Sequence, residues 1–211
     1  ATMETHPQAT LPARPRRYLI VLEYLELFVL CLGAILVIFT FFFRICNVSG
    51  DSMNPTLRNG QILLVSDLSG APEPGDIIIF HQTSQEYEKL NEPLVKRVIA
   101  VAGQTIEINY SQATVRVDGE LVEENYIQLV NGSGIECGLY SATGDNSICY
   151  EENADGTRDV ILRATVPEGH LFVMGDNRNR SWDSRYQAIG FVDERRVLGK
   201  VFLRLAPWKI F

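Results

Sequence analysis

Residues 27–43 read LFVLCLGAILVIFTFFF, seventeen consecutive residues without a charged side chain. Extended back to Tyr18, the apolar segment carries only two charges, Glu23 and Glu26. A helix over residues 18–43 would be roughly 39 Å long at about 1.5 Å per residue, which exceeds the ~30 Å hydrocarbon core of a bilayer. We therefore predict a transmembrane helix at 18–43 rather than a buried core helix.

The charges on either side of this segment predict its orientation. One arginine, Arg44, follows it, and three precede it: Arg14, Arg16 and Arg17. Because basic residues collect on the cytoplasmic side of membrane spans, we expect residues 1–17 to be a cytoplasmic tail and residues 44–211 an extracytoplasmic domain. The apolar run is longer than that of a cleaved secretory signal, and no small-x-small site follows it. We interpret it as an anchor in a plasma (inner) or thylakoid-type membrane.

The overall charge excludes one class of partner. The formal net charge is −7 and the isoelectric point is about 5.0, whereas phosphate backbones require clustered Lys and Arg. We therefore expect no nucleic-acid binding.

The four cysteines give no sign of a metal site, because no Cys-x-x-Cys or His-rich spacing occurs. Cys31 lies in the apolar segment and Cys46 just beyond it, whereas Cys137 and Cys149 lie in a Gly/Ser/Asn-rich stretch. An oxidising compartment would allow a Cys137–Cys149 disulfide, which the sequence leaves open. We predict no metal and no cofactor.

The rest of the chain has the pattern of short strands. Asp118-Gly119 is the signature of a two-residue hairpin turn. The fold class is predicted to be mostly β, an antiparallel catalytic domain behind the transmembrane helix, with inserted hairpins and loops at 105–165 and no second core at 126–160. The strand-like runs are 62–65, 77–80, 94–101, 105–109, 114–117, 120–122, 160–162, 171–174 and a closing strand within 197–211.

Ser52 stands out as a candidate nucleophile. It lies in SGDSMNPTL (49–57), where Pro55 fixes its own φ and restricts Asn54, so the backbone around the hydroxyl is stiffened. A serine nucleophile needs a base. His6 precedes the membrane segment, and His81 and His170 lie beside strands where we expect edge or turn positions, so a Ser-His-Asp triad is disfavoured.

Lys96 is the candidate base. The stretch LVKRVI (94–99) places an ammonium group inside an apolar strand, and strand alternation sends it to the face opposite Arg97. If that face points inward, burial favours the neutral amine, which could then accept the proton of Ser52. The alternative is a lysine whose stem is buried and whose amine reaches water.

Four stretches resemble, in order, the conserved boxes of the bacterial type I signal peptidases. They are SGDSMNPTL (49–57), PGDIIIF (74–80), LVKRVIAVAGQ (94–104) and VPEGHLFVMGDNRNRSWDSRYQAIGFV (166–192). The eukaryotic reticulum enzymes are similar but use histidine in the third box, where this chain has Lys96. Self-cleaving repressors share a Ser-Lys pair but lack the membrane segment.

The resemblance implies roles for individual residues. Ser52, which precedes Met53, would be the nucleophile and Lys96 the base, while Ser181 would orient the lysine amine. Asp183 and Arg185 would brace the site, more as a salt bridge than through direct chemistry, and a turn would present the loop: Gly175, Asp176 and Asn177.

The oxyanion site departs from one branch of that family. Some members carry a serine two positions before the nucleophile, where this chain has Gly50 followed by Asp51. We therefore expect backbone donors, chiefly the N–H of Ser52.

The implied function is removal of signal peptides from exported preproteins with Ala-x-Ala-like cleavage sites, by a membrane-bound serine endopeptidase. Two alternatives stay open. One is a dedicated peptidase of the same fold that matures a single substrate, such as a pilin or a conjugation protein. The other is a non-catalytic membrane-anchored assembly or binding protein, which the presence of Ser52, Lys96 and Ser181 disfavours.

Overall fold

The computed structural model describes residues 16–68, 70–82, 91–127, 147–153 and 156–206. The chain divides into two compact units, residues 1–41 and 42–211, each of which is described by itself.

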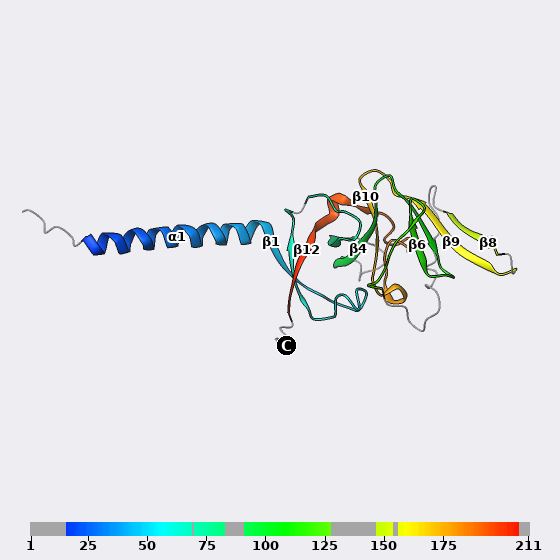
Figure 1. The fold of residues 1–211 in the computed structure, drawn as a ribbon, viewed down its shortest axis with the longest axis horizontal. Helices are drawn as coiled ribbons and strands as arrows, with labels where there is room; N and C mark the ends of the chain where they lie inside the picture. The colour runs from blue at the N-terminus through cyan, green and yellow to red at the C-terminus, as the bar shows by residue number, and fades with distance from the viewer. Residues whose placement is uncertain (1–15, 69, 83–90, 128–146, 154–155, 207–211) are drawn as a thin grey trace, which may run out of the picture. The chain divides into compact units, whose positions relative to one another are not determined.

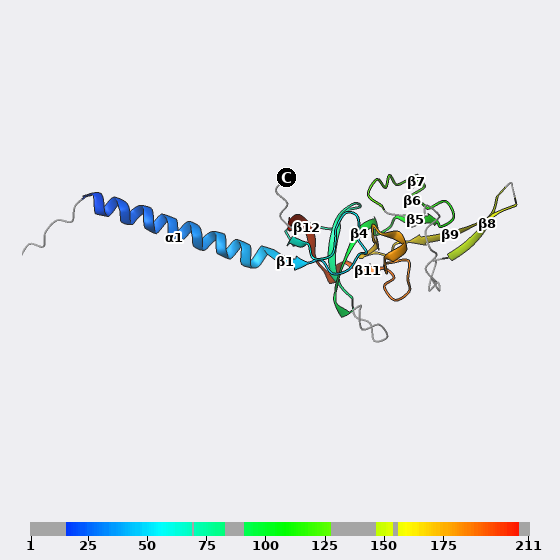
Figure 2. The ribbon, with the colours of Figure 1, turned by 90° about the horizontal axis from the view of Figure 1, so that it is seen from below.

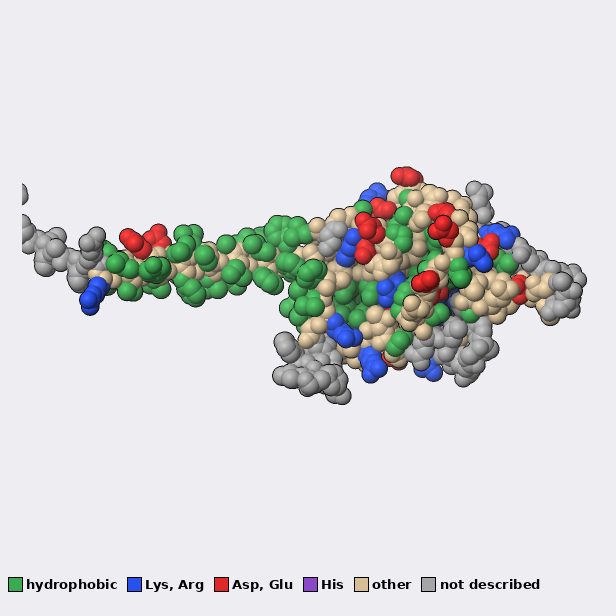
Figure 3. Space-filling view, in the orientation of Figure 1, with side chains coloured by type: hydrophobic (Ala, Val, Ile, Leu, Met, Phe, Trp, Pro, Cys, Tyr) green, Lys and Arg blue, Asp and Glu red, His purple; other side chains and the backbone are tan. Residues whose placement is uncertain are grey.

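The first unit is the helix α1 (Arg16–Phe42), which runs two residues further toward the N-terminus than the apolar pattern indicated. Its stretch from Arg17 to Phe42 is long and apolar enough to cross a membrane, and none of it is buried. Hydrophobic side chains cover the surface of the helix along most of its length (Figure 3). An α-helix forms its backbone hydrogen bonds within itself, as a lipid environment requires. Apolar side chains on all of its faces suit contact with lipid.

The second unit contains a seven-stranded antiparallel sheet (Figure 1). The strand β1 was not predicted, because the apolar pattern had assigned Phe43 to the helix. Residues 43–47 instead pair with β2 and form the edge of the sheet. The strand order is β1 (Phe43–Asn47), β2 (Ile62–Ser66), β12 (Val197–Ala206), β3 (Ile77–His81), β4 (Pro93–Val101), β10 (His170–Met174) and β11 (Val192–Asp193).

A second, five-stranded sheet occupies much of the stretch expected to be inserted hairpins and loops. Its order is β7 (Glu120–Leu121), β6 (Thr114–Val117), β5 (Thr105–Asn109), β9 (Arg158–Thr165) and β8 (Ser147–Glu152). The predicted Asp118-Gly119 turn is confirmed, since both residues have positive φ and Val117 pairs with Glu120. The hairpin β8–β9 extends away from the rest of the unit (Figures 1 and 2).

The hairpins within 105–165 also carry part of the core, because side chains of this sheet pack against the first sheet. Alternating residues of β5 and β9 point to one face and meet residues of β4 and β10. The buried members are Ile99, Ala100, Ile106, Ile108, Tyr110, Val115, Leu162, Ala164, Val166, Phe172 and Met174. Residues 128–146, including Cys137 of the possible disulfide, lie outside the described residues.

A separate apolar cluster fixes the segment that carries Ser52. Met53 and Leu57 are buried with Val48 against side chains of β2 and β3. The same segment is closed at its base by Val48, which donates to Gln61 O and accepts from Gly60 N. The loop between β1 and β2 is therefore anchored by apolar packing directly beside Ser52.

We predict that Met53→Ala destabilises the protein by about 2–5 kcal/mol, because the thioether is buried and its removal leaves a cavity. Urea unfolding followed by tryptophan fluorescence measures the change in the free energy of unfolding. Leu68→Ala is the matched control, since Leu68 is 59% exposed and its truncation should cost no more than about 0.5 kcal/mol. Equal effects of the two changes would contradict the anchoring role.

Candidate active site

The described structure brings Ser52 and Lys96 together, although 44 residues separate them in the sequence. Ser52 lies in the turn after β1, and Lys96 lies in β4 opposite Ile78 of β3. Lys96 Nζ is 2.9 Å from Ser52 Oγ and donates to the carbonyl oxygen of Val95 at 3.0 Å. Only 3% of Lys96 is exposed, so the expectation of an inward-facing lysine is confirmed.

Burial lowers the pKa of Lys96 from 10.5 to about 8, because removing the amine from water disfavours its charged form. Three charges modify this effect: Asp183 and Asp176 raise the pKa, and Arg185 lowers it. The amine is thus neutral in a substantial fraction of molecules near pH 8. A neutral amine at hydrogen-bond distance from a hydroxyl can accept its proton.

The polar loop after β10 is organised by the expected ion pair between Asp183 and Arg185. Arg185 Nε lies 2.8 Å from Asp183 Oδ1, with both side chains fully buried. Asp183 Oδ2 also accepts from the backbone N–H of Gly175 at 3.0 Å. Although burial disfavours its charged form, the charge and hydrogen bonds of Arg185 hold the pKa of Asp183 below its usual value.

This loop also holds the backbone of the nucleophile. The backbone N–H of Asn177 donates to Ser52 O at 3.0 Å, and Asn177 Nδ2 donates to Asp51 O at 3.1 Å. The predicted Gly175-Asp176-Asn177 turn therefore contacts the segment 51–52 directly. The contact fixes the main chain of Ser52, while packing of Met53 fixes the next residue.

A cleft of about 290 Å³ opens beside the two side chains. It lies between residues 46–49 and residues 92–96, and Ser52, Met53 and Lys96 line it. On this side of β4 the partner β10 pairs only with residues 97–101, so the edge at 93–96 has no strand partner among the described residues. An unpaired edge next to a narrow, mostly apolar cleft can accept an extended peptide.

Neither a Ser52–His pair nor a metal-holding group of side chains is found among the described residues. No hydrogen bond joins His81 or His170 to Ser52, and His170 Nδ1 is instead 2.8 Å from the carbonyl of Glu168. No group of three or more His, Cys, Asp or Glu side chains in the described ranges is arranged to hold a metal ion.

A sequence profile described as signal peptidase, peptidase S26, matches residues 21–208. The chain belongs to this family. It is therefore an enzyme, a serine peptidase of family S26. Among curated relatives, signal peptidase I of Bacillus caldolyticus is 37% identical over 78% of this chain and 80% of the relative. The probable signal peptidase I-1 of a Synechocystis strain is 34% identical over 76% of this chain and 69% of the relative.

Two further matches are also named as signal peptidases. Signal peptidase IB of Staphylococcus aureus is 34% identical over 78% of both chains. The crystal structure of a signal peptidase I from Enterococcus faecalis V583 matches with a TM-score of 0.42 and 27% identity, over 62% of this chain and 97% of that chain.

Ser181 lies within the loop of this peptidase but without the expected contact to Lys96. Its side chain is buried, and no hydrogen bond joins its Oγ to Lys96 within the described part of the chain. It stands against Gly175, where a Cβ would collide with the serine side chain. Its orienting role therefore remains a prediction.

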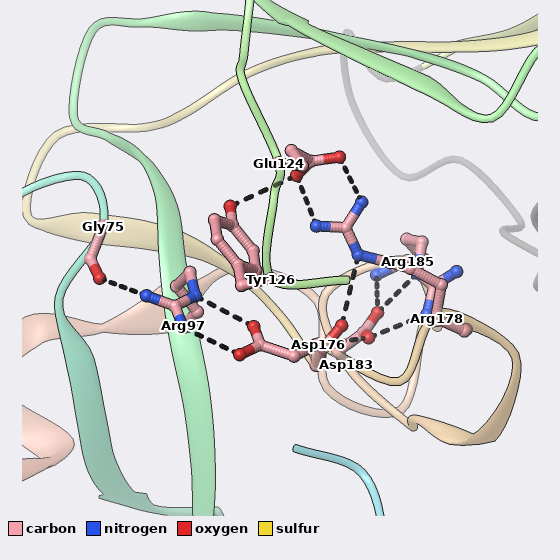
Figure 4. A network of polar contacts seen from close by, with 9 residues as sticks. Gly75, Arg97, Glu124, Tyr126, Asp176, Arg178, Asp183 and Arg185 are labelled. Atoms are coloured by element: carbon pink, nitrogen blue, oxygen red, sulfur yellow. Dashed lines mark hydrogen bonds and ion pairs between the residues drawn. The ribbon is translucent and has the colours of Figure 1, made fainter. Parts of the chain in front are cut away.

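Several charged residues of the site were not assigned from the sequence. Arg97 Nε and Nη2 donate to the two oxygens of Asp176 at 2.9 and 2.7 Å, and Arg178 pairs with Glu124 (Figure 4). Arg97 and Arg178 lie within two of the four family boxes, so the boxes were the signal that could have found them. Glu124 and Tyr126 follow β7 in the second sheet, and no spacing in the sequence connects them to Ser52 or Lys96.

Gly175→Ala is predicted to lower activity about 100-fold. A Cβ at this position would lie only 2.5 Å from both Ser52 O and Ser181 Cβ, so either the loop or the nucleophile must move. A shift of about 1 Å at a catalytic group can cost on the order of 100-fold in rate, which a peptide-cleavage assay would detect. Gly33→Ala is the control, because nothing lies within 4 Å of that position. Full activity in both variants would contradict the prediction.

The pH dependence of kcat/KM is predicted to have an acid limb near pH 8. Lys96 can accept a proton only when neutral, so activity rises as pH increases through its pKa of about 8. Well below that value kcat/KM should fall about tenfold per pH unit. Initial rates with a fluorogenic peptide, measured between about pH 5 and about pH 11, test this. A limb near the ordinary lysine value of 10.5 would argue that Lys96 is hydrated in solution.

Proposed function

We propose that this peptidase removes N-terminal signal peptides from exported preproteins by a Ser52/Lys96 acyl-enzyme mechanism. The observation that carries the proposal is the 2.9 Å distance between Lys96 Nζ and Ser52 Oγ, with the amine buried. The names of the curated relatives support the substrate class.

Neutral Lys96 takes the proton of Ser52 as Oγ attacks the scissile carbonyl carbon. The resulting oxyanion is stabilised by the backbone N–H of Ser52, a donor that makes no hydrogen bond within the described ranges. Lys96 then returns the proton to the leaving amine as the C–N bond breaks and the Ser52 ester remains. Water deprotonated by Lys96 attacks that ester, which frees the signal peptide carboxylate and regenerates the Ser52 hydroxyl.

The cleft supports a preference for small side chains before the cut. At about 290 Å³ it lies at the lower end of ligand-pocket sizes, and Val48, Met53 and Leu94 contribute apolar surface. An extended preprotein can add as a strand to the open edge of β4 at residues 93–96, so that alternate side chains face the cleft. Such geometry favours Ala-x-Ala-like sequences.

We further propose that α1 anchors the enzyme as a single membrane span with its N-terminus in the cytoplasm and the peptidase domain on the extracytoplasmic side. The arginines before the helix support this orientation by the positive-inside rule. The preprotein's own apolar segment would lie in the same bilayer. The membrane is expected to be the plasma (inner) or thylakoid-type membrane.

The test is incubation of the detergent-solubilised protein with a preprotein, with mass spectrometry of the product N-terminus. Wild type should cut after a small-x-small sequence, whereas Ser52→Ala and Lys96→Met should each lose about 10³-fold or more in rate. Lys96→Met should not lower the melting temperature, because it replaces a buried amine by an apolar side chain of similar length.

Processing by Ser52→Ala at the wild-type rate would overturn the proposal. A panel of unrelated preproteins separates a general enzyme from a dedicated one, since cleavage confined to a single substrate would exclude the general role.

A further inference from the structure

The segment 122–127, which follows β7, joins the second sheet to the loop that holds the nucleophile (Figure 4). Two of its side chains, Glu124 and Tyr126, point toward arginines on different elements: Arg178 in the loop after β10, and Arg97 in β4. Neither Glu124 nor Tyr126 lines the cleft beside Ser52. Their contacts therefore act on the geometry of the site from outside that cleft.

Glu124 binds the guanidinium of Arg178 with both of its oxygens. Arg178 Nη1 donates to Oε2 at 2.7 Å and Nη2 donates to Oε1, while the two side chains are 0% and 6% exposed. Arg178 is itself tied into the loop twice: its Nε donates to Gly175 O at 3.2 Å, and its carbonyl accepts from Arg185 Nη2 at 2.7 Å. A bidentate, buried pair of this kind restrains both position and orientation.

Tyr126 acts on the other arginine. The guanidinium carbon of Arg97 lies 3.9 Å from the centre of the Tyr126 ring, and Arg97 is bidentate to Asp176. The Tyr126 hydroxyl donates to Glu124 Oε1 at 3.3 Å, so the two side chains of the segment also support each other. Burial and the charge of Glu124 raise the pKa of Tyr126 to about 12, which keeps the hydroxyl protonated.

Both lines of contact end at the same turn. Glu124 reaches Gly175 through Arg178, and Tyr126 reaches Asp176 through Arg97. The next residue, Asn177, donates its backbone N–H to Ser52 O. Arg97 is also the neighbour of Lys96 in β4, so the segment is connected to the element that carries each member of the Ser52/Lys96 pair.

We propose that Glu124 and Tyr126 are positioning residues that hold the Gly175–Asn177 turn against Ser52. They thereby set the distance between Ser52 Oγ and Lys96 Nζ and exclude water from the lysine amine. The inference rests on the proposed function of that pair. The inference deepens that function, because it gives a part in the chemistry to the segment 122–127, which follows the second sheet's strand β7 and lies outside the four family boxes.

The principal test is Glu124→Gln in the full-length, detergent-solubilised protein, assayed with a peptide that spans a small-x-small cleavage site. The variant keeps the shape but loses the charge opposite Arg178. We expect kcat to fall about 10- to 100-fold, as for a catalytic group displaced by a fraction of an ångström to 1 Å, with KM within about twofold of wild type. Glu123→Gln is the matched control, because it removes the same charge from the exposed neighbouring residue.

The pH profile distinguishes positioning from mere stabilisation. Asp183, Arg185 and Asp176 act electrostatically on Lys96, and Ser52 contacts it, but desolvation is the largest cause of its lowered pKa. A loosened turn admits water, so the acid limb of kcat/KM in Glu124→Gln should move to higher pH. Lower stability alone would reduce the folded fraction, measured by circular dichroism, without moving this limb.

A second pair of variants keeps the inference testable if Glu124→Gln does not fold. Tyr126→Phe retains the ring over Arg97 and should keep most of the activity, whereas Tyr126→Leu removes the ring and should lower kcat and shift the acid limb. If Tyr126→Leu and Glu124→Gln match Glu123→Gln in kcat and pH profile, the positioning role is wrong although the Ser52/Lys96 mechanism stands. If wild type does not cleave the peptide, or Ser52→Ala cleaves it equally, both proposals fail.

Discussion

One buried amine held against one hydroxyl is the constraint on which the other features of the site depend. Taking Lys96 out of water makes its neutral form accessible near pH 8, and the 2.9 Å contact places the amine within reach of the Ser52 hydroxyl. Burial of the amine and its exact placement are in conflict, because a pocket without water has few groups that can hold an amine in place. Apart from Ser52, the amine has only the carbonyl of Val95 as a hydrogen-bond partner in the described structure.

The surrounding charges resolve this conflict by pairing with one another. Arg97 binds Asp176, Arg178 binds Glu124, and Arg185 binds Asp183. Buried ion pairs add little to stability on balance, but removing one partner leaves a costly unpaired charge, so each pair strongly disfavours any other arrangement of the loop. The result is a wall of paired charges around Lys96, and burial remains the largest cause of its lowered pKa.

The sequence was most informative where the signal is local. The charge-free run predicted the helix, Asp118-Gly119 predicted its turn, and an ammonium within an apolar strand identified Lys96. The strand β1 was missed because its pairing with β2 is a tertiary effect. The shared core was missed because residues of β5 and β9 meet residues of β4 and β10 only in the folded chain. Glu124 and Arg178, 54 residues apart, form a pair that no spacing rule detects.

In the mechanism proposed for Ser52 and Lys96, a lysine base in place of histidine accounts for the part that we propose for the segment 122–127. A histidine base titrates near neutrality without help and needs chiefly a partner to orient its ring, whereas a lysine must be moved some two to three pH units by exclusion of water. Exclusion demands closely packed walls rather than one orienting contact. The Ser52 segment, β4 and the loop after β10 supply three such walls, and the segment 122–127 holds the last of these in place through Arg178. A serine–lysine site therefore requires more of its fold to be ordered than the two side chains themselves would suggest.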